Sequence, residues 1–172
     1  MHIGQLRPEH RSRLAELLVQ TGAFHADEVH VALSLFDLTH GADGAAVEEA
    51  ALDYEFAGAF VDEQLMGYAC FGPTPATDGT FDLYWLAVDP AAQGRGIGRA
   101  LVRHVEAKLI ARGGRLLVVE TSSRPDYAST RQFYTRSGYT EAARVRDFYA
   151  PADDRILLTT RLTTRDGGVS TR

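Results

Sequence analysis

The segment "TFDLYWLAVDPAAQGRGIGRALV" (Thr80–Val102) places a strand-like run directly before a glycine-rich turn. Its first part, Thr80–Val88, is rich in the aromatic and β-branched residues that favour β-strands. Pro90 ends this run, because proline has no N–H group for a strand ladder. Three glycines at alternate positions then precede a helical pattern: Gly94, Gly96 and Gly98. Because glycine has no side chain, a ligand at this junction would meet the backbone itself.

A helix that begins at these glycines would present unpaired N–H groups and the positive end of its dipole to an anion. Arg95, Arg99 and Arg103 are spaced by four residues and therefore share one face of the predicted helix. No Asp or Glu interrupts residues 90–105. The pattern favours a phosphate site. A tight turn followed by solvated arginines is the alternative interpretation of the same residues.

Two phosphate-binding motifs can be compared with this spacing. The P-loop pattern G-x-x-x-x-G-K-[ST] occurs nowhere in the chain. The dinucleotide pattern G-x-G-x-x-G requires glycine where the two possible registers have Arg99 and Leu101. The spacer Asp89–Gln93 is also longer than that pattern expects. Glu120, at the end of the next predicted strand, could imitate the ribose-binding acid, so the dinucleotide alternative is weakened but stays open.

Composition limits the class of protein. The chain has 172 residues, 45% of them hydrophobic and 24% charged, which suits one domain with a buried core. A formal net charge of −5 disfavours nucleic acid and acidic membranes, since both attract positive potential. The only cysteine, Cys70, excludes an intrachain disulfide and a C-x-x-C metal site. With no apolar run near 20 residues and no signal-peptide pattern, we expect a cytoplasmic protein without a metal.

The apolar periodicity predicts the order of the elements. A short strand at His2–Leu6 precedes two amphipathic helices, in residues 8–22 and 25–41. Residues 54–73 are typical of a hairpin. The helix after the glycines is followed by a strand, a short helix and a late strand, in residues 115–121, 127–138 and 155–162.

This order predicts an α/β fold of the α+β type. We expect a single domain over residues 1–162 with a mixed, mostly antiparallel sheet flanked by helices. The crossover through the glycine-rich turn should make Thr80–Val88 parallel to Leu116–Thr121. We expect Arg146–Arg155 to be a turn-rich connector between the last two strands, and residues 163–172 to fray.

The two motifs together resemble a known family. "LAVDPAAQGRGIGRALV" resembles the acetyl-coenzyme-A signature Q/R-x-x-G-x-G/A of the GNAT superfamily of N-acetyltransferases, and it follows a strand as that family requires. "YASTRQFYTRSGY" (Tyr127–Tyr139) resembles the later family motif, a helix with F-Y followed by a glycine and an aromatic residue. The resemblance covers roughly residues 54–162. Tyr127 and Thr130 stand where many members have asparagine and alanine, so this helix departs from the family pattern at two positions.

The resemblance implies a set of donor-binding residues. The backbone of the strand end would pair with the pantetheine arm, and the amides of the glycine loop would hold the pyrophosphate. The implied residues are Leu86, Ala87, Val88, Gln93, Gly94, Arg95, Gly96, Ile97, Gly98, Arg99, Thr130 and Phe133. The implied partners are acetyl-coenzyme A and an amine acceptor, and a homodimer is common in the superfamily.

The implied chemistry is direct transfer of an acetyl group to a primary amine of a small molecule or protein. Roughly one alkyl amine in a thousand is neutral at pH 7, so a general base would help. Glu120 at a strand end is the first candidate, with Asp82 and Tyr84 as alternatives. Strand alternation would put Asp82 and Tyr84 on one face of the sheet and Trp85 on the other. Tyr134 would protonate the departing thiolate, although a packing role is the alternative.

Two other functions stay open at this point. The chain could be a noncatalytic domain that binds acyl-coenzyme A as a sensor, or a nucleotide-binding oxidoreductase module. The acceptor is not identified, because the N-terminal helices and the late strands carry no diagnostic motif.

Overall fold

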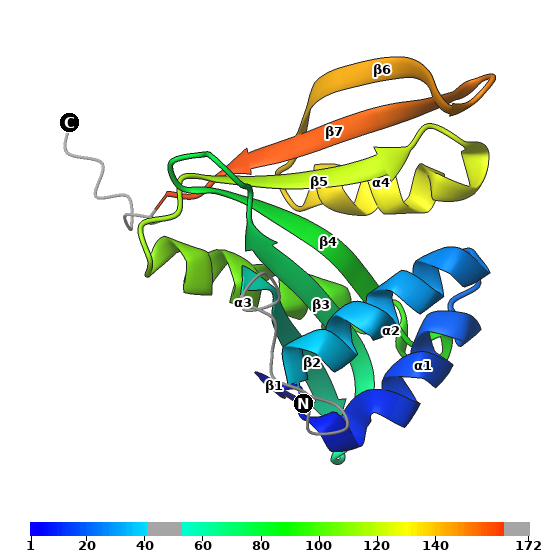
Figure 1. Cartoon of the computed structure of the whole chain (residues 1–172), viewed down its shortest axis with the longest axis vertical. Helices are drawn as coiled ribbons and strands as arrows, with labels where there is room; N and C mark the ends of the chain where they lie inside the picture. The colour runs from blue at the N-terminus through cyan, green and yellow to red at the C-terminus, as the bar shows by residue number, and fades with distance from the viewer. Residues whose placement is uncertain (41–52, 164–172) are drawn as a thin grey trace.

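The computed structural model describes residues 1–40 and 53–163 as a sheet with helices on both faces (Figure 1). The N-terminal elements are β1 (His2–Gln5), η1 (Pro8–His10), α1 (Arg11–Gln20) and α2 (Ala26–His40). The middle of the chain forms β2 (Glu55–Val61), β3 (Gln64–Pro73), β4 (Thr80–Val88), η4 (Pro90–Ala92) and α3 (Ile97–Ile110). The last elements are β5 (Leu116–Ser122), η5 (Pro125–Tyr127), α4 (Ala128–Arg136), β6 (Thr140–Ala150) and β7 (Asp153–Arg161). The expected fold class is confirmed.

The seven strands form one sheet in the order β1-β2-β3-β4-β5-β7-β6. Every neighbouring pair is antiparallel except β4 with β5, which is parallel. The helix α3 connects that pair, because parallel strands require a long crossover. The turn between β2 and β3 consists of Asp62 and Glu63, both with positive φ, as a two-residue hairpin turn of the mirror-image type needs.

The parallel pair separates partway along its length. Thr80–Leu83 of β4 pairs with Leu116–Val119 of β5, but β4 continues to Val88 and β5 to Ser122. Beyond this point the two strands diverge (Figure 1). The backbone of each strand therefore has no ladder partner from the other strand there. We call this opening the fork; it divides the sheet into β1–β4 and β5–β7.

A β-bulge lies in β4 just beyond the last paired residue. Cys70 of β3 pairs with Trp85 and Phe71 pairs with Leu83, so Tyr84 is an extra residue on β4. A bulge interrupts the two-residue alternation of side chains. Tyr84 and Trp85 consequently pack against the same core cluster, with ring centroids 6.1 Å apart. The expectation that Trp85 faces away from Tyr84 is wrong for this reason.

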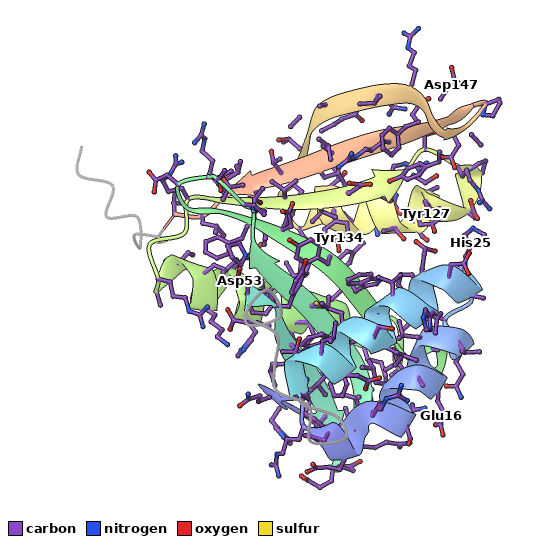
Figure 2. All side chains as sticks on the ribbon, viewed as in Figure 1. Glu16, His25, Asp53, Tyr127, Tyr134 and Asp147 are labelled. Carbon is purple, nitrogen blue, oxygen red and sulfur yellow. The ribbon has the colours of Figure 1, made fainter. Side chains whose placement is uncertain are left out.

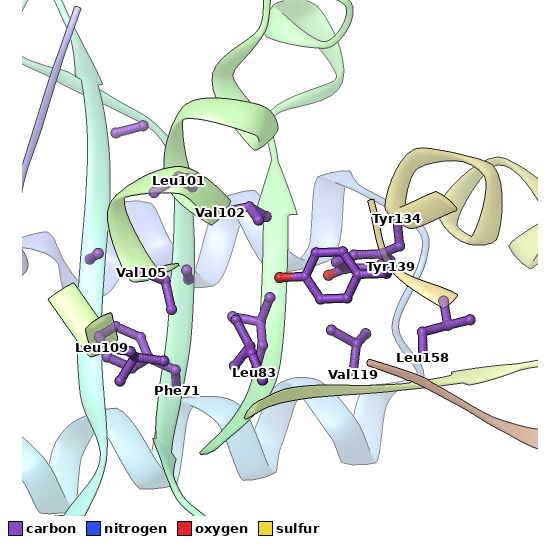
Figure 3. Close-up of a cluster of buried hydrophobic side chains, with 14 of the residues drawn as sticks. Phe71, Leu83, Leu101, Val102, Val105, Leu109, Val119, Tyr134, Tyr139 and Leu158 are labelled. Atoms are coloured by element: carbon purple, nitrogen blue, oxygen red, sulfur yellow. The ribbon is translucent and has the colours of Figure 1, made fainter. Parts of the chain in front are cut away.

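Two hydrophobic clusters hold the helices to opposite faces of the sheet. One cluster packs α3 and α4 against the sheet. Figure 3 shows Leu101, Val105 and Leu109 at one end of this cluster and Tyr134 and Tyr139 at the other. The second cluster lies under α1 and α2 and contains Cys70, which is fully buried. Cys70 is therefore a residue of the core.

The chain departs from the expectation in its last strands. β6 extends to Ala150 and β7 begins at Asp153, so most of the expected connector Arg146–Arg155 is strand. The long antiparallel pairing of β6 with β7 overrides the turn-forming residues, with a register shift between Val145 and Ala150. Residue 41, where we expect the second helix to end, and almost all of the expected tail (163–172) lie outside the described residues.

Candidate active site

A cavity of about 660 Å³ lies between the end of β4, the glycine-rich turn and α4. Side chains or backbone from both motifs line it: Leu86, Val88, Ala92, Gln93, Gly94, Gly96, Ile97, Gly98, Arg99, Ser129, Thr130, Gln132, Phe133, Tyr134, Arg136 and Ser137. The fold thus brings together two segments that are about forty residues apart in sequence. The volume lies within the range typical of ligand pockets.

The glycine loop owes its shape to two residues with positive φ. Gly94 has φ 74° and Gly96 has φ 82°, a region that costs other L-residues roughly 1–2 kcal/mol. Gly96 is the N-cap of α3 and provides no side-chain hydrogen bond to the first turn. A Cβ atom at Gly94 or Gly96 would point into open space. The amides of the first turn are therefore available to an anion, as pyrophosphate binding requires.

Gly98 plays a different part, because it lies where α3 contacts α4 and the end of β4. A Cβ atom there would lie 3.4 Å from a ring carbon of Phe133 and 3.6 Å from a methyl carbon of Val88. Any larger side chain would therefore occupy the cavity wall between the two helices. A side chain longer than that of alanine at the third glycine of the motif would thus narrow the cavity.

The end of β4 turns backbone groups toward the fork. The N–H group of Asp89 donates to the carbonyl of Met66 in β3 at 2.8 Å. Since successive strand residues direct their N–H and C=O groups to opposite edges, Ala87 faces β3, whereas Leu86 and Val88 face the fork. The side-chain amide of Gln93 donates to the Val88 carbonyl at 3.2 Å.

Asp89 fixes the turn between β4 and the glycines. Its side chain is 6% exposed, accepts a hydrogen bond from the Ala91 amide at 2.8 Å and forms an ion pair with Arg13 of α1. The Ala91 hydrogen bond, and secondly the Arg13 guanidinium, lower the pKa of Asp89 because both favour the charged carboxylate.

Tyr134 is the buried aromatic residue of the cavity wall. It is 4% exposed, and its ring meets those of Phe133 and Tyr139 edge-on, with centroids 5.0 and 5.2 Å away. Burial raises the pKa of the Tyr134 phenol well above its usual value, since the phenolate would be desolvated. The hydroxyl therefore carries its proton at neutral pH and can donate it.

Glu120 does not line the cavity but lies at the fork. It is the first residue of β5 beyond the last pair with β4, Leu83–Val119. Val119 belongs to the cluster under α3, so strand alternation directs Glu120 to the opposite face. Its carboxylate accepts a hydrogen bond from the Tyr149 hydroxyl at 2.5 Å and forms an ion pair with Arg155.

The carboxylate of Asp82, the alternative base, also has a hydrogen-bond partner. It accepts a hydrogen bond from the Thr74 hydroxyl at 2.5 Å. Burial, and secondly the charge of Asp82, raise the pKa of the Tyr84 phenol well above its usual value. Tyr84 is therefore protonated at neutral pH and unsuited to act as a base there.

Most of the residues expected at the donor site converge on the cavity. Two of them, Ala87 and Arg95, do not line it, and neither does Glu120, the expected general base. Ala87 is buried in the cluster under α1 and α2. The sequence analysis missed five lining residues: Ala92, Ser129, Gln132, Arg136 and Ser137. Ser129, Arg136 and the C-cap Ser137 are three or four residues from Phe133, so helical spacing could have identified these three.

Tyr127 makes a contact that no motif indicates. Its hydroxyl donates to the carbonyl of Ala23, between α1 and α2, at 2.9 Å. This hydrogen bond connects the start of α4 to the N-terminal helices, and Tyr127 and His25 lie at the same end of the molecule (Figure 2). Tyr127 is absent from the cavity wall, in agreement with its departure from the family motif.

Within residues 1–40 and 53–163, no cluster of three or more His, Cys, Asp or Glu side chains is arranged to hold a metal ion. None of the helices in that part of the chain combines the length and apolar character needed to cross a bilayer.

Comparison with known proteins agrees with this geometry. The model of the acetyltransferase (GNAT) family matches residues 22–139. A crystal structure from Desulfovibrio desulfuricans, assigned to the GNAT family, has a TM-score of 0.85 and 38% identity and covers 94% of this chain and 99% of that one. An aminoglycoside 6′-N-acetyltransferase complexed with coenzyme A, with 16% identity and a TM-score of 0.73, covers 96% of this chain and 99% of that one, and it shares the fold.

The ribosomal protein bS18-alanine N-acetyltransferase of Escherichia coli is 34% identical over 87 residues, which is 51% of this chain. The matched segment spans 57% of that enzyme, little more than half its length. The family model covers well over half of this chain, and both sequence motifs lie on the wall of one cavity. The chain belongs to the GNAT acetyltransferase family.

Proposed function

We propose that this protein is an N-acetyltransferase that transfers an acetyl group directly from acetyl-coenzyme A to a primary amine. The observation that carries the proposal is the 660 Å³ cavity, which is lined by the first turn of α3 and by the buried residue Tyr134 of α4. Membership of the GNAT family supports it.

The cavity offers partners for two parts of acetyl-coenzyme A, the pyrophosphate and the pantetheine arm. The first-turn amides of α3, which have no side-chain cap, would hold the pyrophosphate. The backbone of Leu86 and Val88, turned to the fork, would pair with the amides of the pantetheine arm in the manner of an added strand. An aminoglycoside acetyltransferase of the same fold is complexed with coenzyme A, which supports coenzyme A as the ligand. Ala87 and Arg95 stay predictions with less support.

In the proposed reaction the neutral amine nitrogen attacks the thioester carbonyl carbon, the carbon–sulfur bond breaks and the thiolate leaves. The amine loses one proton and the thiolate gains one. Glu120 would accept the first proton, directly or through water, because it lies at the fork on the face opposite α3. Tyr134 would supply the second proton, because burial keeps its phenol protonated.

The acceptor is a small-molecule amine or a protein amino group. The name of the E. coli relative specifies the alanine of a ribosomal protein, so an N-terminal α-amino group is one acceptor to test. A cytoplasmic location and a homodimer stay predictions of the sequence and its family resemblance.

Release of free thiol from acetyl-coenzyme A tests the proposal. The purified protein should bind acetyl-coenzyme A in isothermal titration and release thiol with at least one amine of a panel of polyamines, aminoglycosides and peptide N-termini. Binding without thiol release across the panel would favour the noncatalytic acyl-coenzyme-A sensor. Binding of NADH without binding of acetyl-coenzyme A would contradict both.

A further inference from the structure

A second, smaller hollow of about 70 Å³ adjoins the main cavity. Its wall consists of Arg99, Val102, Arg103, Glu106, Arg136 and Ser137. Three of these residues, Arg99, Arg136 and Ser137, also line the main cavity. The two spaces are therefore neighbours, with α3 on one side of both and the end of α4 on the other.

Three guanidinium groups meet at this hollow without partners. Among the described residues, Arg99, Arg103 and Arg136 make no ion pair within 4.0 Å, and no hydrogen bond from their side chains is present. Most other arginines among the described residues form ion pairs, as Arg112 does with Glu55 and Arg144 with Glu141. In a chain of net charge −5, three unpaired cations thus gather at one hollow, where together they would stabilise an anion.

The single carboxylate of the hollow does not neutralise them. Glu106 is three residues from Arg103 on α3, a spacing that often forms an ion pair. Instead it accepts a hydrogen bond from the hydroxyl of Tyr139 at 3.0 Å. The hollow therefore keeps a positive balance of charge, and the guanidinium groups remain available.

The position along α3 matches the chemistry of the donor. Arg103 is one helical turn beyond Arg99, a rise of about 6 Å, and the first turn of α3 is the proposed pyrophosphate site. Coenzyme A carries a second anionic group, a phosphate on the 3′ oxygen of the ribose that bears the pyrophosphate. With the pyrophosphate on the loop, that phosphate would lie within one ribose of it.

We propose that Arg99, Arg103 and Arg136 form a subsite for the 3′-phosphate of coenzyme A. The inference rests on the proposed donor site and assigns a specific part of the ligand to α3 and α4 together. It makes the protein selective for coenzyme A over 3′-dephospho-coenzyme A. Arg103 is the informative residue, because it lines only the smaller hollow.

Isothermal titration at low ionic strength with coenzyme A and 3′-dephospho-coenzyme A tests the proposal. An exposed charge pair contributes a factor of about two to five in affinity, so three should give the full chain a preference near tenfold for coenzyme A. Because each pair would then contribute about twofold, Arg103→Ala should lower this preference to about fivefold, and Arg103→Ala with Arg136→Ala to about twofold. Arg103→Lys should restore part of it, because the charge remains.

Arg161→Ala is the matched control. The substitution removes the same charge from β7, and Arg161 lines neither the main cavity nor the smaller hollow. Its preference should equal that of the unmodified chain. Equal affinity of the unmodified chain for both ligands would overturn the subsite while leaving the donor site intact. A loss of preference as large in Arg161→Ala as in Arg103→Ala would also overturn it, because the effect would then be a diffuse one of net charge. Failure to bind either ligand would contradict the donor site and the subsite together.

Discussion

The substitution Tyr134→Phe removes one oxygen from the cavity wall and retains the ring. Tyr134 is 4% exposed, and its edge-on contacts with Phe133 and Tyr139 depend on the ring alone. We therefore expect the free energy of unfolding to change by less than about 1 kcal/mol. If the phenol protonates the departing thiolate, kcat should fall by about 100-fold, which corresponds to about 2.7 kcal/mol of transition-state stabilisation.

The pH dependence sharpens this prediction. Because burial raises the pKa of Tyr134 well above its usual value, the phenol carries its proton throughout pH 6–9. The ratio of kcat between the unmodified enzyme and the variant should therefore be constant over that range. The affinity for acetyl-coenzyme A should stay within about twofold, because the lost group acts on the sulfur only as it leaves.

The assay is release of free thiol, measured with a chromogenic thiol reagent. Cys70 should not contribute background, since it is fully buried and burial raises the pKa of its thiol. Tyr68→Phe is the matched control: Tyr68 is also buried, and its hydroxyl has no hydrogen-bond partner among the described residues. A Tyr134→Phe variant with kcat within threefold of the control at every pH would refute the role of general acid.

Three further changes test other parts of the structure. Gly96→Glu puts a like charge at the proposed pyrophosphate site and should raise the KM for acetyl-coenzyme A far more than that for the amine; equal changes in steady-state kinetics would count against the anion site. Asp89→Ala breaks a buried contact with Arg13 and should cost about 2 kcal/mol at pH 7 in urea unfolding. Since the folded pKa of Asp89 is lowered, this contribution is present above about pH 4 and disappears as the pH falls through the folded value, so the difference from the unmodified chain should shrink in acid. Burial raises the pKa of Tyr68 and Tyr139, so their contribution to stability is complete below about pH 10 and falls as the pH rises from there. The Tm should decline above pH 10, and less steeply in Tyr68→Phe.

The donor site could be predicted from the sequence because its chemistry is local. Gly94 and Gly96 adopt positive φ and leave open space where a side chain would be. Glycine is the residue that allows both, so its presence in the sequence indicates them. The helical spacing on α4 likewise determines which side chains share a face with Phe133. Neither inference depends on a distant segment.

Other assignments depended on long-range contacts and could not be made from the sequence. The direction of the Ala87 backbone depends on its pairing with β3, which no local pattern specifies. Glu120 is held by Tyr149 and Arg155 from the last two strands. The bond from Tyr127 to Ala23 spans 104 positions, so the sequence shows the departure from the family motif but not its partner.

Two interruptions of β4 coincide, and together they explain how one strand serves both substrates. Pairing with β5 ends at Leu83, and Tyr84 is the extra residue of the bulge. The first interruption leaves the backbone of Leu86 and Val88 without a ladder partner from β5. The second turns both Tyr84 and Trp85 toward the α1 and α2 face, away from the donor cavity. In the proposed reaction, donor and amine would therefore approach the fork from opposite faces of the sheet. A regular β4–β5 ladder would fill the opening with its own hydrogen bonds, so the missing pairs are as necessary to this site as the side chains around it.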